Sequence, residues 1–473
     1  MKLTKLIKKA KLSLSLPETR DFTVRGITCN SGQVKKGFVF IAIKGCSNDG
    51  TRFIHQALKN GAGAVISPLT VPPEINTRLI AAKLAAEFYA NPSAKIRVVG
   101  ITGTNGKTTV SYLLERVLKE ALKNPAVIGT INYRFNKRII PSNNTTPGPV
   151  DLQHMLSRML KGKVTHCVME VSSHALDQER VKGIGFSSAI FTNLTSDHLD
   201  YHKTLSGYFK AKAKLFKELD RKAFAVINND DKYARFLKKI CAAKVITYGI
   251  NKSSSVMARN IKFNPSSTEF ILKIPRKELL IKTKLIGRHN VYNVLSVIAW
   301  ALNEGIKFSH IKRAIEGFDF VPGRLERVEC KKGFSVFVDY AHTEDALRNI
   351  IRSLRQVSKG RIIVVFGCGG DRDKIKRPKM GKTVTELADY ALITSDNPRS
   401  EDPAEIARDI IKGIRKKNYA VILQRRDAIK KSLVLAKNGD IVLIAGKGHE
   451  TYQVIKDKKI HFDDRKVVKS CLK

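Results

Sequence analysis

A glycine-rich loop that carries a lysine and two threonines stands between an apolar run and a helix-like run. Its residues are Gly103, Thr104, Asn105, Gly106, Lys107, Thr108 and Thr109. In such a loop the backbone N–H groups hold phosphate oxygens, the lysine reaches the outer phosphates and the threonine hydroxyl ligates Mg²⁺. The strict GxxxxGK[ST] pattern fails because Ile101 occupies the first glycine position, which leaves an ordinary glycine loop as the alternative. The order of strand, loop and helix predicts ATP binding.

Acidic and imidazole groups follow on later runs. The apolar run HCVME ends at Glu170, and a carboxylate at the end of a strand is well placed to ligate Mg²⁺. The segment FTNLTSDHLDYH then places four candidate ligands within six residues, namely Asp197, His198, Asp200 and His202. Two interpretations stay open for this segment: a metal site, or the start of a helix capped by Ser196 and Asp197.

Alternating strand-like and helix-like runs predict the elements that position these residues. The apolar runs of the middle region are IRVVGIT, HCVMEV, SAIFTNL, AFAVINN and KVITYGI, and those after residue 322 are FSVFVDYA, RIIVVFGCG, YALITSD, YAVIL and DIVLIAG. This alternation is typical of parallel sheets covered on both faces. Nearer the N-terminus, VRGIT and GFVFIAI predict strands, and HQALKNGAGAVI predicts a helix that ends in glycines. We therefore expect an α/β protein with domains at residues 1–95, 96–322 and 323–473.

Length and composition agree with this organisation. A chain of 473 residues is too long for one ordinary hydrophobic core, which favours about three domains. With 43% hydrophobic and 27% charged residues it is neither a disordered polyelectrolyte nor a membrane protein. Residues 1–16 lack the apolar segment of a secretory signal, so we expect a cytoplasmic protein without membrane insertion. The seven cysteines show no metal-ligand spacing.

The net charge of +44 comes from 86 Lys and Arg against 42 Asp and Glu. A dedicated nucleic-acid binder would concentrate such charge in a tail, a stripe or a motif with interleaved aromatic residues. Here the lysines are spread along the whole chain. We interpret the excess as a general surface bias that attracts anions nonspecifically, and we expect no specific nucleic-acid partner.

Nine short blocks, in matching order, resemble the Mur ligases of peptidoglycan synthesis. The blocks are TGTNGKTTV, EVSSHALDQERV, FTNLTSDHLDYH, GRHNVYN, VPGRLERV, VDYAH, GCGGDRDKIKRPKMG, SDNPR and AGKGHE. The resemblance extends over nearly the whole chain. It implies an N-terminal domain for a UDP-linked substrate, a central P-loop-type ATPase domain with a parallel sheet, and a mobile C-terminal Rossmann-like domain.

The resemblance also implies an ATP-dependent amide ligase of cytoplasmic peptidoglycan precursor synthesis. Its small-molecule substrates would be ATP, UDP-N-acetylmuramoyl-L-alanyl-D-glutamate and meso-diaminopimelate. ATP would phosphorylate the D-glutamate carboxylate, and the amine of the amino acid would attack the acyl phosphate. Lys107 and Mg²⁺ would offset charge on the transferring phosphoryl group. We expect a monomer.

The same resemblance assigns roles around ATP. The residues that resemble metal ligands are Thr108 and Glu170 for one Mg²⁺, and His198 and a carbamylated Lys212 for a second. Lys210 and Lys214 lie two residues to either side of Lys212, so a shifted register stays open, as does a plain basic helix face. The residues that match nucleotide contacts are Asn290, Asn293, Arg324 and Asp339. Pro322-Gly323 would suit a hinge.

Contacts with the UDP-linked substrate are implied for a further group. Its residues are Ser31, Thr145, Thr146, Ser172, Gln178 and Arg180. The chain departs from the family at Asn30-Ser31-Gly32, where the family usually reads Asp-Ser-Arg. The charged side chain usual at that position is therefore missing.

The residues assigned to the incoming amino acid are Arg372, Asp396, Asn397, Pro398, Arg399, Gly446 and Glu450. The block DNPR resembles that of members that add meso-diaminopimelate. Its distal carboxylate would pair with Arg372 and Arg399, and Glu450 and Asp396 could take the distal ammonium. Lysine would leave both guanidinium groups unpaired. The alternative is that Arg399 is a solvated loop residue.

Two other classes of function stay open. Another ligase of the superfamily, such as the dipeptide-adding Mur ligase or a folylpolyglutamate synthetase, is disfavoured by EVSSHALDQ and DNPR. A non-catalytic, nucleic-acid-associated relative would use the positive charge. Such a binding module has no need of Lys107, Glu170, Lys212 and DNPR together.

Overall fold

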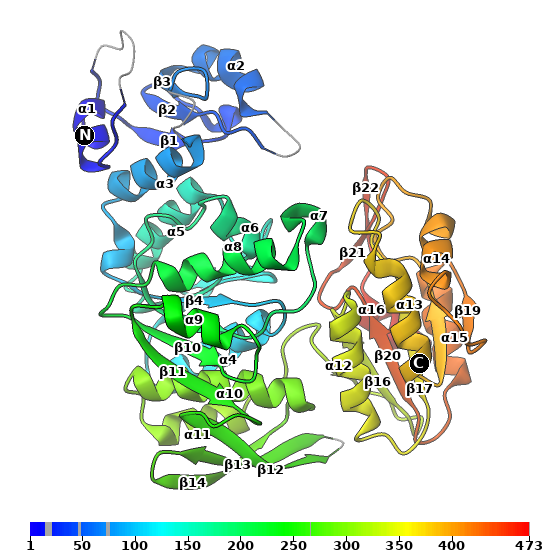
Figure 1. Ribbon diagram of the computed structural model, residues 1–473. Coiled ribbons are helices and arrows are strands. Elements are labelled where there is room, and N and C mark those ends of the chain that lie inside the picture. Colours follow the sequence, from blue (N-terminus) through cyan, green and yellow to red (C-terminus); the bar gives the residue numbers. More distant parts are fainter. Residues whose placement is uncertain (15–20, 46–48, 72–75, 265, 473) are drawn as a thin grey trace.

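The three largest β-sheets of the described residues, each with flanking helices, follow one another along the chain (Figure 1). The computed structural model describes residues 1–14, 21–45, 49–71, 76–264 and 266–472. Helices and mostly parallel strands alternate, so the expected α/β class is confirmed. No helix within these described ranges is long and apolar enough to cross a membrane.

The N-terminal unit, blue in Figure 1, is built on a small parallel sheet. Its strands are β1 (Gly26–Thr28), β2 (Phe38–Ile41) and β3 (Ala62–Ile66). Its helical elements are α1 (Leu3–Lys9), η1 (Ser31–Gln33), η2 (Gly50–Phe53), α2 (Ile54–Lys59), α3 (Thr77–Phe88) and η3 (Pro92–Ala94). The helix predicted in HQALKNGAGAVI is confirmed as α2, which ends before the glycines, whereas the strand at the end of this segment was not anticipated. Gly61 has φ +91° and ends the helical backbone, and the β-branched Val65 and Ile66 continue in β3.

The central sheet has 11 strands in the order β14-β13-β12-β11-β10-β9-β4-β8-β5-β6-β7. The parallel strands at its centre are β4 (Arg97–Thr102), β5 (Pro125–Ile128), β8 (His166–Glu170), β9 (Phe186–Phe191), β10 (Phe224–Asn228) and β11 (Lys244–Gly249). The strands that complete its two edges are β6 (Asn132–Phe135), β7 (Arg138–Pro141), β12 (Val256–Asn264), β13 (Ser267–Ile274) and β14 (Lys277–Thr283). Sheet pairing turns antiparallel at both edges. The strands predicted for this region are confirmed, whereas the edge hairpins were not anticipated.

Helices cover both faces of the central sheet. Val99 and Ile101 of β4 join one core cluster, and Val98 joins the other, as alternation along a strand requires. The helices over the first cluster are α4 (Lys107–Glu120), α10 (Arg288–Asn303) and α11 (Phe308–Glu316). Those over the second are α5 (Pro149–Lys161), α6 (Ser173–Asp177), α8 (Leu205–Lys217) and α9 (Ala234–Ile240), and the short α7 (Leu199–His202) precedes α8.

The C-terminal unit, yellow to red in Figure 1, contains a six-stranded sheet in the order β15-β16-β20-β17-β18-β19. Its strands are β15 (Glu326–Val328), β16 (Ser335–Asp339), β17 (Ile362–Phe366), β18 (Tyr390–Ile393), β19 (Tyr419–Val421) and β20 (Ile441–Ala445). The remaining elements are α12 (Glu344–Arg355), α13 (Lys376–Leu387), α14 (Pro403–Ile411), α15 (Arg425–Leu435), α16 (Asp464–Leu472) and the hairpin β21 (Tyr452–Ile455) and β22 (Lys458–His461). All strands predicted here are confirmed.

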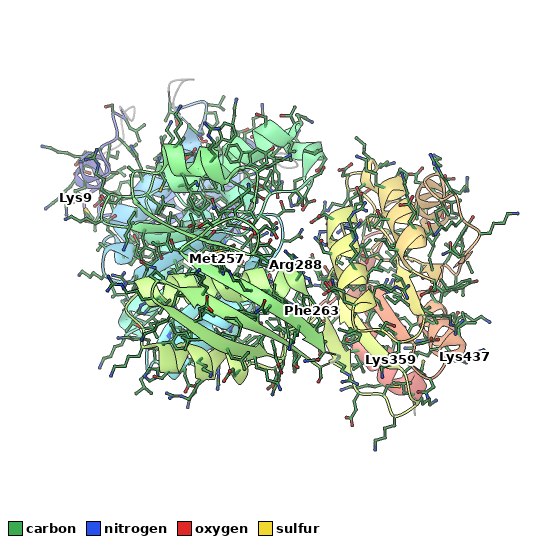
Figure 2. All side chains as sticks on the ribbon, turned by 60° about the horizontal axis from the view of Figure 1, so that its bottom comes forward. Lys9, Met257, Phe263, Arg288, Lys359 and Lys437 are labelled. Atoms are coloured by element: carbon green, nitrogen blue, oxygen red, sulfur yellow. The ribbon has the colours of Figure 1, made fainter. Side chains whose placement is uncertain are left out.

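The lysines are distributed over the molecule. Lys9 lies at one side of the molecule in Figure 2, and Lys359 and Lys437 lie near each other on the C-terminal unit at the other side. This arrangement agrees with a general surface bias, and the absence of a specific nucleic-acid partner stays a prediction.

Candidate active site

The phosphate loop joins the end of β4 to the start of α4, at the centre of the largest sheet. Gly103 has φ +150° and Gly106 has φ +89°. A Cβ atom on Gly103 would lie 1.9 Å from Thr192 Oγ1, and one on Gly106 would lie 2.4 Å from Asn293 Oδ1. Side chains other than hydrogen are therefore excluded at both positions, which explains the two glycines of the block.

The loop after β9 holds the phosphate loop in place. The Asn193 carbonyl oxygen accepts the backbone N–H of Thr104 at 2.8 Å, and its side-chain oxygen accepts that of Asn105 at 2.9 Å. The Thr104 hydroxyl donates to the Thr195 carbonyl at 3.2 Å and lies 3.3 Å from the Tyr208 hydroxyl. Loop and strand end thus form one rigid surface.

Two ammonium groups meet on one carbonyl oxygen of this loop. Lys107 Nζ donates to the Gly103 carbonyl at 2.8 Å, and Lys212 Nζ donates to the same atom at 2.9 Å. Burial lowers the pKa of Lys107, which Glu170 opposes. Burial, and then the charge of Lys107, lowers the pKa of Lys212 well below its usual value. The two amines lie so close together that a charge on one disfavours a charge on the other.

The three lysines of α8 have different surroundings. Lys212 is buried and its Nζ lies 4.5 Å from the centre of the Tyr208 ring. Lys210 is exposed, and Lys214 pairs with Glu179 at 3.3 Å. Of the three, Lys212 is the one that contacts the phosphate loop, which favours the original register over the shifted one.

Glu170, at the end of β8, gathers hydroxyl groups around one carboxylate. Its Oε2 accepts hydrogen bonds from the hydroxyls of Thr108 at 3.0 Å and Thr130 at 2.9 Å, and the side chain is buried. No group of three or more His, Cys, Asp or Glu in the described ranges is placed to hold a metal by itself. One carboxylate and one hydroxyl suit Mg²⁺, which usually takes few protein ligands and completes its shell with phosphate oxygens and water.

The capping interpretation of the segment with two aspartates and two histidines is wrong, and its four candidate ligands do not come together as one group. His198 is the N-cap of α7 with φ +55°, and no side chain caps this helix, so capping by Ser196 and Asp197 is wrong. The four side chains do not point to one place, because Asp200 is exposed and His202 Nε2 lies at hydrogen-bond distance from the Ser173 hydroxyl.

His198 faces the cavity from this segment. Its Nε2 lies 3.4 Å from Asp197 Oδ2, and its ring packs edge-on against His174 at 4.8 Å between ring centres. Burial lowers the pKa of His198 to about 4, although Asp197 opposes the shift. A neutral imidazole at this position could serve as a metal ligand.

The C-terminal unit reaches the phosphate loop through an arginine. Arg324 Nη2 lies 3.3 Å from Thr108 Oγ1, and its guanidinium stacks over the Tyr340 ring at 4.4 Å. Asp339 Oδ2 accepts the backbone N–H of Leu325 at 2.5 Å. Burial raises the pKa of Asp339 to about 6, and Arg324 opposes the shift.

A cavity of about 500 Å³ joins these groups between the central and C-terminal sheets. The predicted residues that line it are Thr104, Asn105, Gly106, Lys107, Thr108, Thr109, Thr145, Ser172, His198, Lys212, Asn290, Asn293, Arg324 and Asp339. Within this lining the amide of Asn293 donates to Asn290 Oδ1 at 3.0 Å. The structure therefore brings together most residues assigned to ATP.

One residue of this cavity was missed by sequence reasoning. Asp345 Oδ2, in the first turn of α12, accepts the Asn105 amide at 2.9 Å and the Thr195 hydroxyl at 3.3 Å. Burial raises the pKa of Asp345. The only available signal was an acidic residue shortly after the block VDYAH.

Most residues assigned to the UDP-linked substrate form a connected group beside the cavity. Arg180 donates to the Thr146 carbonyl at 3.0 Å and to Gln178 Oε1 at 2.7 Å, and Thr146 Oγ1 accepts the Ser172 N–H at 3.1 Å. Ser31 is separate from this group, since it lies in the N-terminal unit and donates to Gln56 at 2.8 Å.

Gly32 leaves space that a side chain could occupy. The nearest atom to a Cβ on Gly32 would be Asn30 Oδ1 at 3.4 Å, an ordinary contact. The Asn30 side chain instead caps η1 by accepting the Gly32 N–H at 3.0 Å. The turn at residues 30–33 itself contains no cationic side chain.

The residues assigned to the amino acid form a second cluster, in the C-terminal unit. Asn397 Nδ2 donates to Glu450 Oε2 at 2.9 Å, and Arg399 Nη1 donates to the Gly370 carbonyl at 2.6 Å. Asp396 Oδ2 is buried without a hydrogen-bond partner in the described part of the chain, beside Gly446. An unpaired buried carboxylate oxygen is costly and suits a cationic ligand.

The arginine pair lies in this second cluster. Burial, and then the like charge of Arg372, lowers the pKa of Arg399. Arg399 is half-buried with φ +53°, which does not fit a solvated loop residue. Both side chains lie beside Gly369, since a Cβ on Gly369 would be 2.9 Å from Arg399 Nη1 and 3.8 Å from Arg372 Cγ. Two guanidinium groups held close to each other are suited to bind an anion.

A phosphate loop at the centre of a parallel sheet, with a carboxylate at the end of the next strand, defines a nucleotide-binding α/β protein. Three family descriptions match the chain in succession: Mur ligase family, catalytic domain, at residues 23–102; Mur ligase middle domain, at 101–301; and Mur ligase, glutamate ligase domain, at 323–448. The chain belongs to the Mur ligase family.

Relatives of full length support this assignment. UDP-N-acetylmuramoyl-L-alanyl-D-glutamate--2,6-diaminopimelate ligase of Clostridium botulinum is 43% identical over 464 residues, which is 95% of each chain. The protein of the same name from Caldanaerobacter subterraneus is 44% identical over 482 residues, covering 100% of this chain and 99% of its own.

Solved structures have the same fold. A structure of UDP-N-acetylmuramoyl-L-alanyl-D-glutamate--2,6-diaminopimelate ligase, 33% identical, superposes with a TM-score of 0.68 over 95% of this chain and 94% of its own. MurF ligase from Thermotoga maritima in complex with ADP, 21% identical, gives a TM-score of 0.67 over 95% and 97%. The second likeness concerns the fold alone.

Proposed function

We propose that this protein is an ATP-dependent ligase that joins meso-diaminopimelate to UDP-N-acetylmuramoyl-L-alanyl-D-glutamate. The observation that carries the proposal is the Thr108–Glu170 pair beside Lys107, because it places an Mg²⁺-type oxygen set next to a phosphate-binding ammonium. The names of relatives about 43% identical over the full length support the choice of substrates.

The reaction would proceed in two steps within this cavity. The D-glutamate carboxylate attacks the γ-phosphorus of ATP, which gives an acyl phosphate and ADP. The amine of meso-diaminopimelate then attacks the acyl carbon, an amide forms, and phosphate and a proton leave. Lys107 and Arg324, which both lie at the phosphate loop, would stabilise the charge that develops on the transferred phosphoryl group.

Mg²⁺ bound by Thr108 and Glu170 would neutralise phosphate oxygens. We assign a second metal position to His198 and to Lys212 in carbamylated form. The low pKa of Lys212 supports this modification, since only an uncharged amine adds to CO₂. The carbamate would place a negative charge beside the ammonium of Lys107 and attract it.

Each of the three units would bind a different substrate. We assign residues 1–95 to the UDP moiety, 96–322 to ATP and 323–473 to the amino acid. Ser31 in the first unit and the Thr146–Arg180 group in the second would contact the UDP-linked substrate. We propose that the protein acts as a monomer in the cytoplasm.

The decisive experiment is phosphate release with ATP, Mg²⁺ and UDP-N-acetylmuramoyl-L-alanyl-D-glutamate, with meso-diaminopimelate, L-lysine or no amino acid. We expect turnover with meso-diaminopimelate alone. Turnover with L-lysine instead would retain the ligase and overturn its amino-acid specificity. Absence of turnover with either, in a protein that binds ATP, would overturn the proposed reaction.

A further inference from the structure

A fully buried lysine lies at the centre of the amino-acid cluster, and none of the roles above involves it. Lys447 follows β20, and its side chain is 0% exposed. Burial of an ammonium is unfavourable unless acceptors surround it. Among the described residues, Lys447 Nζ has two acceptors, Asn397 Oδ1 and Glu450 Oε2, each at 3.1 Å.

Lys447 and the backbone N–H of Val454 together determine the orientation of the Asn397 amide. One amide atom of Asn397 contacts both Lys447 Nζ at 3.1 Å and the backbone N–H of Val454 at 2.9 Å. Both partners are donors, so this atom must be the oxygen. The amide nitrogen must then point at Glu450 Oε2, which lies 2.9 Å away.

The same arrangement leaves a free carboxylate oxygen on Glu450. Oε2 accepts both bonds, from Lys447 and Asn397, while Oε1 receives none from any described residue. The Glu450 side chain is 16% exposed, so Oε1 is open to a ligand. Asp396 Oδ2 is the second carboxylate oxygen of this cluster without a partner. The pair is suited to bind an ammonium.

Lys447 also sets the charge of the cluster. Arg399 is influenced by the charges of Arg372, Asp396, Glu450 and Asp371. These two guanidinium groups and three carboxylates together carry one negative charge, which the ammonium of Lys447 offsets. Its removal would favour a ligand end that carries an ammonium alone over one that carries both an ammonium and a carboxylate.

We propose that Lys447 is a positioning residue that makes the cluster select an amino-carboxylate terminus over a simple amine. It acts by fixing Asn397 and the free oxygen of Glu450 and by offsetting one negative charge of the cluster. The inference rests on the proposed ligase function and extends it to a residue that does not touch the substrate.

The test compares Lys447→Met with Lys459→Met. Both lysines have Nζ near the Tyr452 ring, at 5.6 Å and 3.7 Å from its centre, but Lys459 is exposed on β22. For Lys447→Met we expect the KM for meso-diaminopimelate to rise about tenfold, and the ratio of its kcat/KM to that of L-lysine to fall by about the same factor. The KM for ATP should stay unchanged in Lys447→Met. In Lys459→Met, the KM for meso-diaminopimelate and the ratio of the two kcat/KM values should both stay unchanged.

A second variant, Lys447→Gln, guards against misfolding of the first. It retains an N–H donor for Glu450 but not the charge, so the selectivity ratio should fall less. An equal loss of kcat with both amino acids would overturn the inference, and so would the loss of cooperative unfolding in both variants. Either result would mean that the ammonium of Lys447 only stabilises the fold. An unchanged ratio in an active enzyme would overturn the inference alone. A wild-type enzyme inactive with either amino acid would overturn the proposed function with it.

Discussion

Gly323 and Gly448 pack backbone against backbone where the segment that enters the C-terminal sheet meets the loop after β20. A Cβ on Gly448 would lie 2.6 Å from the Gly323 carbonyl oxygen, and one on Gly323 would lie 2.0 Å from the His449 nitrogen. Arg324, the next residue, reaches Thr108 at the phosphate loop. The amino-acid cluster and the ATP cavity therefore share one backbone contact.

Gly448→Ala tests this contact. The added methyl group must separate the two segments, so we expect the free energy of unfolding to fall by roughly 1–3 kcal/mol. We also expect kcat to change by a larger factor than the KM for ATP or for meso-diaminopimelate. Gly439→Ala is the matched control, because Gly439 has φ +84° but no atom within 4 Å of its Cβ position. Equal effects on kcat in both variants would mean that backbone strain alone, and not the contact, is responsible.

Asp345→Asn tests whether the negative charge of the carboxylate on α12 weakens the binding of ATP. Asp345 lies against Asn105 and lines the cavity, so its negative charge faces the phosphates. The substitution retains an oxygen acceptor, and removal of about 1 kcal/mol of repulsion should tighten ATP binding about fivefold in equilibrium titration. Glu344→Gln, in the same turn but bonded to Arg348, should leave ATP affinity unchanged. Weaker binding by Asp345→Asn would contradict the prediction.

Local sequence predicted the parts of the site that depend on one loop or one strand end. The phosphate loop and Glu170 belong to this class, because glycines, lysine and an apolar run determine their conformation within a few residues. Asp345 and Lys447 were missed because their roles come from partners 240 and 50 residues away in the sequence, Asn105 and Asn397.

Two differences from the expected local structure have a similar cause. The segment HQALKNGAGAVI was interpreted as helical up to its glycines, yet its last residues form a strand because β3 pairs with β2 after the left-handed Gly61. His198 took the N-cap position expected of Ser196 or Asp197 because this loop is bonded to its surroundings, for instance through Leu194 N–H to Asp231. Tertiary contacts overrode the local preference in both cases.

Carbamylation of Lys212 predicts dependence on CO₂. Its amine adds to CO₂, a C–N bond forms and one proton is released, so modification should be lost as pH falls. Dialysis at acidic pH without CO₂ should reduce kcat, and ¹³C-bicarbonate at neutral pH should restore it together with a carbamate signal in the ¹³C NMR spectrum. Lys212→Ala should be inactive and lack the signal, whereas Lys210→Ala, exposed on the same helix, should behave as wild type. Full activity without the signal would exclude the modification.

His289 predicts a specific acid sensitivity. Burial lowers the pKa of His289 to about 4, whereas the pKa of a histidine in the unfolded chain is about 6.5. The neutral imidazole therefore contributes stability that is fully present above pH about 6.5 and is lost as pH falls toward about 4, up to about 3 kcal/mol in total. Urea unfolding of His289→Gln across this window should show a shallower pH dependence than wild type. Parallel curves would mean that other groups account for the acid loss.

Replacement of Arg399 tests how far the selectivity for meso-diaminopimelate over L-lysine depends on one guanidinium group. It is half-buried, it is held by the Gly370 carbonyl at 2.6 Å, and Arg372 repels it, so an added carboxylate would relieve two like charges. Arg399→Ala should raise the KM for meso-diaminopimelate about 10- to 150-fold, since a charge-assisted hydrogen bond contributes about 1.5–3 kcal/mol. The KM for ATP should not change, because Arg399 does not line the ATP cavity. Arg399→Lys retains the charge without the planar fork and should recover only part of the loss. Arg408→Ala, an exposed arginine of α14, is the control. If Arg399→Ala changed the kinetics of L-lysine and left those of meso-diaminopimelate intact, the assignment of the distal carboxylate to the arginine pair would be wrong.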